Sequence, residues 1–92
     1  AEKALSLDKD NPYIKDTLSA LLLISNDPKK ALPYASEAAK ALPNYVEVQV
    51  NYARVLAANN NTSKARDVLN SILSKAKSYE HRKQINEELN KL

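Results

Sequence analysis

Two stretches, "SNDPKKA" (Ser25–Ala31) and "NNNTSKA" (Asn59–Ala65), decide how this chain is organised. Each is a polar cluster that ends in Lys-Ala and precedes an apolar run, and the final alanines of the two stretches lie 34 residues apart. Similarity at a fixed period of this length is typical of repeat proteins, in which each repeat is one supersecondary unit. We therefore expect two copies of one structural unit.

The residues around both stretches predict helices. Apolar side chains recur at three- and four-residue steps along most of the chain, which is the spacing of one helix face. The expected helices run from residue 12 to about 26, from 28 to 42, from 46 to the asparagine cluster at 59, from 62 through 73, and from 79 to 92. The period of 34 residues therefore contains a helix, a turn and a second helix.

Polar residues and prolines predict where these helices begin. Asn11 and Asp27 can cap the first two helices, each with a proline directly after it, and either Asn61 or Thr62 can cap the fourth. The chain contains no glycine, the residue that most often ends a helix in the left-handed conformation. Asparagine tolerates that conformation better than most residues, so Asn60 is expected to adopt it.

The composition excludes several classes of protein. The chain of 92 residues has no cysteine, which excludes disulfides and thiolate metal sites. The lack of glycine argues against phosphate-binding loops and dinucleotide-binding turns. The longest apolar run, residues 20–24, is far shorter than the ~20 residues of a membrane span. No signal peptide is recognised and the first residue is not Met, so we expect a fragment whose compartment, cytoplasmic or periplasmic, stays open.

Charge is distributed unevenly. Residues 1–45 hold six basic and six acidic side chains, whereas residues 46–92 hold eight basic and five acidic ones, which accounts for the net charge of +3. The densest basic cluster consists of Lys75, Lys77, Arg82 and Lys83, with Tyr79 among them. Such a cluster is usually a solvated face, and it can also attract an acidic partner. One aromatic residue among four charges is too little to predict nucleic-acid binding.

Large and small residues recur in the same order in the two units. In residues 12–45 the order runs through Leu18, Ser19, Leu22, Ala31, Ala35, Ala38 and Pro43. In residues 46–79 it runs through Tyr52, Ala53, Leu56, Ala65, Leu69, Ile72 and Lys77. This order resembles the tetratricopeptide repeat (TPR) family, and more narrowly the C-terminal repeats of longer bacterial TPR proteins. Ala35, Ile72 and Lys77 depart from the preferred residue types, which indicates a divergent repeat.

This resemblance implies an all-α fold, a right-handed superhelix of antiparallel helical hairpins with a C-terminal capping helix. A single domain would cover residues 1–92. Residues 1–11 would be the end of a preceding repeat, residues 12–45 and 46–79 the two repeats, and residues 80–92 the capping helix.

The resemblance also implies a protein–protein interaction module, an adaptor or assembly scaffold that binds a peptide or partner protein in a concave groove. The groove positions fall on Tyr13, Asp16, Thr17, Ala20, Glu47, Val50, Asn51, Arg54, His81, Gln84 and Ile85. Ordinary solvated residues on an exposed helix face are the alternative for this set. Two further alternatives are a structural C-terminal cap with binding done upstream, and self-association through Leu5 and Leu7 of the leading remnant.

No residue pattern indicates catalysis, a cofactor or a metal. His81 is the only histidine, and neither a metal-ligand cluster nor a nucleophile with an orienting partner accompanies it. Some TPR domains bind a terminal carboxylate with Lys, Asn and Arg side chains. Asn51 matches that pattern, but Asp16, Ala20, His81 and Ile85 do not, so a carboxylate clamp of that type is not expected.

Overall fold

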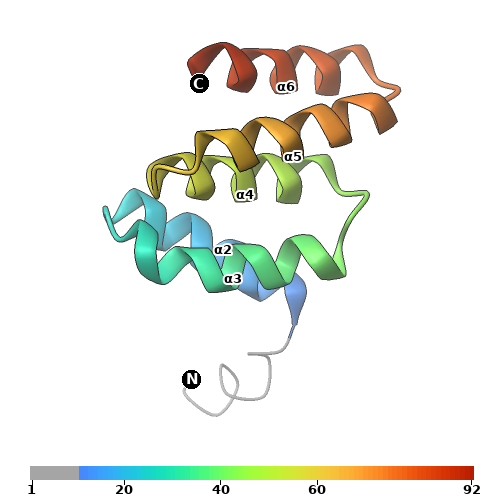
Figure 1. The fold of residues 1–92 in the computed structure, drawn as a ribbon. Helices are drawn as coiled ribbons and strands as arrows, with labels where there is room; N and C mark the ends of the chain where they lie inside the picture. The colour runs from blue at the N-terminus through green and yellow to red at the C-terminus, as the bar shows by residue number, and fades with distance from the viewer. Residues whose placement is uncertain (1–10) are drawn as a thin grey trace.

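The computed structural model describes residues 11–92, which form five α-helices joined by short turns (Figure 1). These are α2 (Pro12–Ile24), α3 (Pro28–Ala41), α4 (Val46–Ala58), α5 (Thr62–Lys75) and α6 (Tyr79–Lys91). The predicted all-α fold is confirmed, and each helix begins within a residue of its expected start. The expected end of a preceding repeat, with Leu5 and Leu7, lies outside the described residues.

The helices form two layers. α2 and α3 pair as one antiparallel hairpin and α4 and α5 as a second, while α6 packs on α5 (Figure 1). The alternate helices α2, α4 and α6 also contact one another in sequence, α2 with α4 and α4 with α6. They therefore make one layer, and α3 and α5 make the other.

The turns inside the two hairpins have the same geometry. Asn26 and Asn60 both have positive φ angles, of 61° and 65°, as predicted for Asn60. In the first turn the Asp27 amide donates to the Leu22 carbonyl at 2.8 Å, and in the second the Asn61 amide donates to the Leu56 carbonyl at 2.9 Å. This is the Schellman arrangement that closes a helix end. An asparagine therefore takes the position that a glycine usually occupies, twice at the repeat period.

Substitutions at Asn60 test this account. Asn60→Gly is expected to leave the free energy of unfolding within about 0.5 kcal/mol of the wild type, because glycine adopts positive φ freely. Asn60→Ala is expected to cost about 1 kcal/mol, because its Cβ opposes the left-handed conformation and it lacks the polar side chain. Urea unfolding followed by circular dichroism measures both values, and an alanine variant as stable as the glycine variant would contradict the prediction.

Polar side chains begin three of the helices. Asn11 accepts from the Tyr13 amide at 2.9 Å, Asn61 from the Lys64 amide at 3.3 Å, and Ser78 from the His81 amide at 3.4 Å. The predicted caps at Asn11 and Asn61 are thus confirmed. Asp27 occupies the position before α3 but its side chain makes no capping hydrogen bond. Its carboxylate instead lies 3.8 Å from the Lys30 ammonium.

The core lies where the helices approach one another. Small residues at the repeat positions are fully buried, with Ala31 and Ala65 both 0% exposed. Larger side chains fill the space between hairpins, among them Leu56, Leu69 and Ile85. Small residues let helix axes approach closely while large ones occupy the facing grooves, so the repeat pattern fixes how the hairpins stack.

Two side-chain amides join neighbouring helices in a way that the apolar pattern does not predict. The Gln49 Nε2 donates to the carbonyls of Ala39 at 2.9 Å and Leu42 at 3.2 Å, so α4 satisfies carbonyls at the end of α3. The Asn59 Nδ2 donates to the carbonyls of Pro28 at 2.9 Å and Val55 at 2.8 Å. The Gln49 amide thus satisfies a carbonyl in the last turn of α3, where carbonyls lack partners within the helix, and the Asn59 amide ties the end of α4 to the start of α3.

Candidate partner-binding surface

The predicted groove residues belong to α2, α4 and α6, which form one layer. We call the surface of this layer the α2–α4–α6 face. Tyr13, Thr17, Glu47 and His81 are exposed, and Asp16 is half-buried. Val50 and Ile85, by contrast, are core residues with exposed fractions of 1% and 0%. The expectation that these two side chains face a partner is therefore wrong, because both fill the space between helices.

A buried hydrogen-bond network joins α2 to α4 beneath this face. The Asn51 Nδ2 donates to the Ser19 hydroxyl at 2.6 Å and to the Asp16 carboxylate at 3.1 Å. The Ser19 hydroxyl in turn donates to the Asp16 carbonyl at 2.7 Å, and the serine is 0% exposed. Asn51 is only 9% exposed, so its amide is used inside the protein and is not available to bind a partner's backbone as the sequence suggested.

Asp16 is a half-buried carboxyl on this face whose pKa is raised. Burial raises the pKa of its carboxyl above the ordinary 3.8, the hydrogen bond from Asn51 opposes that rise, and the nearby Glu47 carboxylate adds to it. A raised pKa means that the folded state binds the Asp16 proton more tightly than the unfolded state does. The stability gained in this way is fully present below pH 3.8 and is lost as the pH rises through the raised value.

At pH 7 the free energy of unfolding of Asp16→Asn is therefore expected to equal that of the wild type or to exceed it by up to about 1 kcal/mol. The gain is small because solvent screens a half-buried charge. The asparagine keeps an oxygen that can accept from Asn51. The difference should disappear at pH 3, where the wild-type carboxyl is protonated. Urea unfolding at pH 3 and pH 7 measures it, with Asp67→Asn on α5 as a matched control. An Asp16→Asn variant that is less stable than the wild type only at pH 7 would mean that the ionised Asp16 carboxylate stabilises the fold, and the prediction would be wrong.

An ion pair joins α4 to α6 further along the face. The Arg54 guanidinium lies 2.8 Å from the Glu88 carboxylate, and the Lys91 ammonium lies 3.3 Å from the same oxygen. The hydrogen bond from Arg54 is the main reason that the pKa of Glu88 lies below its ordinary 4.5. The Glu88 side chain is 9% exposed and that of Arg54 46%. Arg54, a predicted partner-binding residue, thus stabilises the stack, and Glu88 is a residue that the repeat positions did not single out.

Two tyrosines, Tyr13 and Tyr45, contact each other at the other end of the face. The Tyr13 hydroxyl donates to the Tyr45 hydroxyl at 2.8 Å, and the rings meet edge to face with their centroids 5.6 Å apart. Both side chains remain about half exposed, at 50% and 51%. Tyrosines of this kind offer large contact area with few rotatable bonds, which suits a binding surface.

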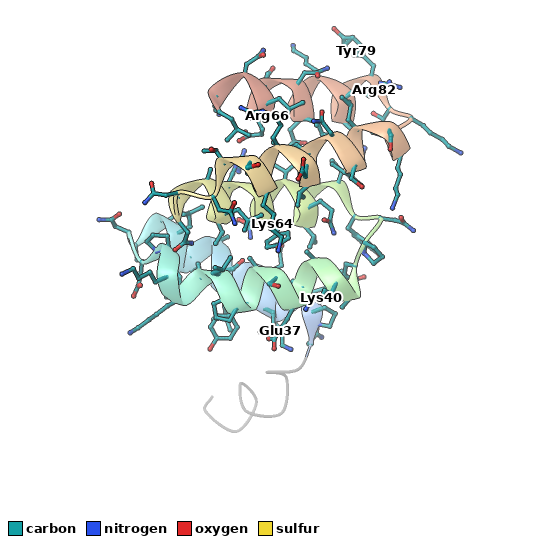
Figure 2. The ribbon with its side chains drawn as sticks, viewed as in Figure 1. Glu37, Lys40, Lys64, Arg66, Tyr79 and Arg82 are labelled. Atoms are coloured by element: carbon teal, nitrogen blue, oxygen red, sulfur yellow. The ribbon has the colours of Figure 1, made fainter. Side chains whose placement is uncertain are left out.

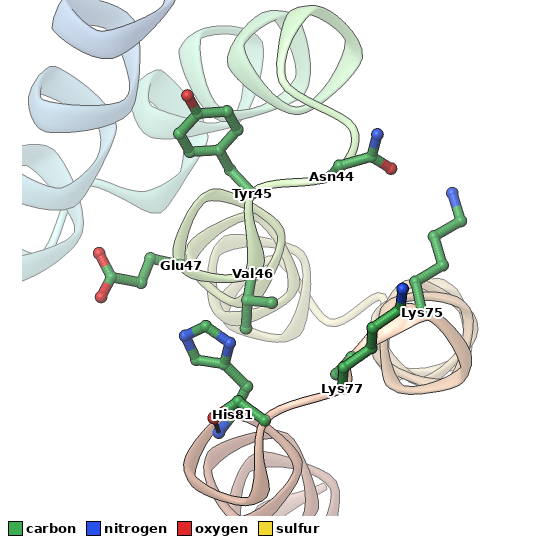
Figure 3. A pocket seen from close by; sticks show the side chains of 9 residues that line it. Asn44, Tyr45, Val46, Glu47, Lys75, Lys77 and His81 are labelled. Atoms are coloured by element: carbon green, nitrogen blue, oxygen red, sulfur yellow. Dashed lines mark hydrogen bonds between the residues drawn. The ribbon is translucent and has the colours of Figure 1, made fainter.

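A hollow of about 480 Å³ lies beside these tyrosines, where α4 and α6 begin and α5 ends (Figure 3). Its walls are formed by Asn44, Tyr45, Val46, Glu47, Lys75, Ala76, Lys77, Ser78 and His81. We call it the lysine hollow. Glu47 and His81 belong both to this hollow and to the predicted partner-binding set, so the hollow adjoins the α2–α4–α6 face.

Residues 11–92 contain no group of three His, Cys, Asp or Glu side chains placed to hold a metal ion. Within the same range, no helix is both long and apolar enough to cross a bilayer.

Stacked helical hairpins with an exposed helical layer define a helical-repeat protein. Comparison with family models gives the particular family, because the tetratricopeptide repeat model matches residues 22–84. The chain therefore belongs to the tetratricopeptide repeat family. No curated protein and no solved structure matches it. Tetratricopeptide repeats generally mediate protein–protein interactions, and the family is typically a non-enzymatic interaction module.

Proposed function

We propose that this domain is an adaptor or assembly module that binds a segment of another protein on the α2–α4–α6 face. The main support is the layer itself, which presents Tyr13, Thr17, Glu47 and His81 to solvent on its three helices. The buried network of Asn51 and the ion pair of Arg54 hold those helices in a fixed arrangement. A surface fixed in advance loses less conformational entropy when a partner binds.

The exposed residues of this face allow a clean test. Thr17→Arg and Glu47→Arg change side chains that are exposed and whose loss leaves the core intact. Ser74→Arg and Asp67→Arg on α5 are matched controls. Ser74 is exposed and bonds a carbonyl of its own helix, as Thr17 does, and Asp67 is an exposed carboxylate on the other layer.

A displayed library of random twelve-residue peptides would be selected on the wild-type domain, and the selected peptides titrated against all four variants by fluorescence anisotropy. We expect the two face variants to weaken binding at least about tenfold, because they place a bulky charge inside the contact area. The two α5 variants should change it less than about twofold. If the face variants and the α5 variants lost the same affinity, or if Thr17→Arg and Glu47→Arg left the affinity unchanged, the peptide would bind outside the α2–α4–α6 face.

The alternative, a structural cap of a longer superhelix, is favoured by a difference between the two ends of the stack. The α2–α3 hairpin exposes Leu21 at 55%, and a largely apolar hollow of about 560 Å³, lined in part by Leu18 and Leu22, lies between its helices. The outer side of α6 carries charged residues and Tyr79, which projects away from the stack with Arg82 nearby (Figure 2).

An apolar face at one end and a charged face at the other suits a unit that stacks on a preceding repeat. Sedimentation velocity over a range of protein concentrations tests whether this apolar face also drives self-association. Association that Leu21→Glu abolishes and Tyr79→Glu does not would assign it to this face. A protein that stays monomeric at all concentrations would exclude self-association.

A further inference from the structure

The lysine hollow has a basic wall that no contact within residues 11–92 neutralises. Lys75 and Lys77 are exposed and form no ion pair in the described part of the chain. Between the two lysines the chain is extended, with φ −72° and ψ 127° at Ala76. Figure 3 shows both side chains reaching in the same direction, toward Asn44.

The single acidic residue of the hollow lies apart from this wall. In Figure 3 the Glu47 side chain extends away from the lysines, with Val46 between them. The hollow therefore has a basic side and an acidic side, and an anion can approach Lys75 and Lys77 without meeting Glu47. The first residues of α4 also line the hollow, and Tyr45 gives that helix no side-chain cap. The partial positive charge of a helix start adds to the field of the two lysines.

We propose that the lysine hollow binds two acidic side chains of the partner peptide, spaced two residues apart in an extended segment. This inference rests on the proposed function and gives the chemistry of the segment that the α2–α4–α6 face receives. In an extended chain, side chains two residues apart point the same way. Lys75 and Lys77 have this spacing across Ala76, so an acid–x–acid segment would match them side chain for side chain.

A protein segment fits this site better than a nucleic acid does. A phosphate backbone carries negative charge at every nucleotide and would pass Glu47 as well as the lysines, whereas a peptide can place two carboxylates on one side only. Nucleic-acid surfaces also need aromatic platforms for the bases. The aromatic residue of the hollow, Tyr45, has its hydroxyl bonded to Tyr13 and its ring packed edge-on against that tyrosine.

The adjoining hollow, of about 300 Å³, is less suited to an anion. It shares Lys75 and adds Lys64, but Asp67 also lines it. An acidic segment that continued from the lysine hollow into this one would meet that carboxylate. Of the two hollows, the lysine hollow therefore suits an anion better, because its acidic residue, Glu47, lies apart from Lys75 and Lys77.

The probe is an acetylated and amidated peptide, Ser-Glu-Ser-Glu-Ser-Glu-Ser, titrated into ¹⁵N-labelled domain and followed by NMR. We expect shifts in the amides of residues 46–47 and 75–78, and affinity that falls as salt rises because the contacts are exposed charges. The double variant Lys75→Gln with Lys77→Gln should weaken binding about five- to tenfold, which corresponds to two exposed charge pairs. The matched control, Lys29→Gln with Lys40→Gln, removes the same charge from α3 and should leave the affinity within about twofold.

Further measurements distinguish a failure of this inference from a failure of the proposed function. A peptide with Gln in place of Glu should not bind, and equal binding would overturn the proposal. Tighter binding of a ten-nucleotide oligothymidylate at the same amides would overturn the choice of partner. Some library peptides could bind the α2–α4–α6 face without an acidic pair and with an affinity that the Lys75 and Lys77 substitutions leave unchanged. That result would overturn this inference and leave the proposed function standing. Shifts confined to the hollow, with Thr17 unmoved, would support the hollow and count against the face.

Discussion

Leu69→Ala is expected to lower the free energy of unfolding by about 3 kcal/mol, the middle of the range for removing a fully buried leucine. Leu69 is 1% exposed and belongs to the core that α4, α5 and α6 share. Removing its three outer carbons takes away apolar burial and leaves a cavity that the surrounding helices cannot close completely. For a domain of this size the melting temperature should fall by roughly 10–20 °C. Urea unfolding and thermal melting, both followed at 222 nm, measure the two quantities.

The matched control is Leu21→Ala, which deletes the same atoms from α2 at a position that is 55% exposed. It should cost less than about 1 kcal/mol, because most of the side chain is already in water. If the two variants lost the same stability, then the space between the second hairpin and α6 would not be the main core, and the assigned packing would be wrong. The comparison therefore tests the stacking of the repeats and not only the importance of leucine.

The sequence predicts the fold well because the same local rules apply twice. Polar residues, prolines and apolar spacing specify each helix from its own residues, and the 34-residue period then specifies how the hairpins stack. The left-handed Asn60 is an instructive case. Without glycine in the chain, few residue types tolerate that turn, so local chemistry alone identified it. Asn26 adopts the same conformation one period earlier.

The surface is harder to predict because burial depends on where neighbouring helices lie. Val50 follows Glu47 and precedes Arg54 at helical spacing, yet α4 is packed on several sides and Val50 is in the core. Similarly, Arg54 looked available for a partner, but Glu88 on α6 binds it. That pair joins residues 34 positions apart, so counting along a single helix could not reveal it. The repeat period itself is the signal that could have.

Polar residues beneath the surface were equally hidden. Gln49 is a polar residue in the largely apolar sequence of α4, and the repeat pattern assigns it no role. In the structure its amide donates to the carbonyls of Ala39 and Leu42 at the end of α3. A hydrogen-bonding side chain thus joins the two helices at this junction. Sequence patterns based on size alone cannot predict this contact.

Asn51→Ala is expected to cost about 2 kcal/mol, although its position first suggested a partner-binding residue. The substitution removes the amide that joins α4 to α2 and leaves the buried Ser19 hydroxyl without its donor. Ser19→Ala should cost less, about 1 kcal/mol, since alanine favours the helix while one Asn51 N–H loses its acceptor. Both values come from urea unfolding of the purified variants.

The double variant decides whether the two residues act as one unit. Once Asn51 is alanine, the Ser19 hydroxyl has no partner on α4, so its removal should cost almost nothing more. We therefore expect the sum of the two single losses to exceed the loss in the double variant by about 1 kcal/mol, a coupling typical of contacting residues. Thr17→Ala combined with Asn51→Ala is the control, and it should be additive within about 0.5 kcal/mol because Thr17 bonds only its own helix. Additive losses for Ser19 and Asn51 would mean that their 2.6 Å contact contributes no stability.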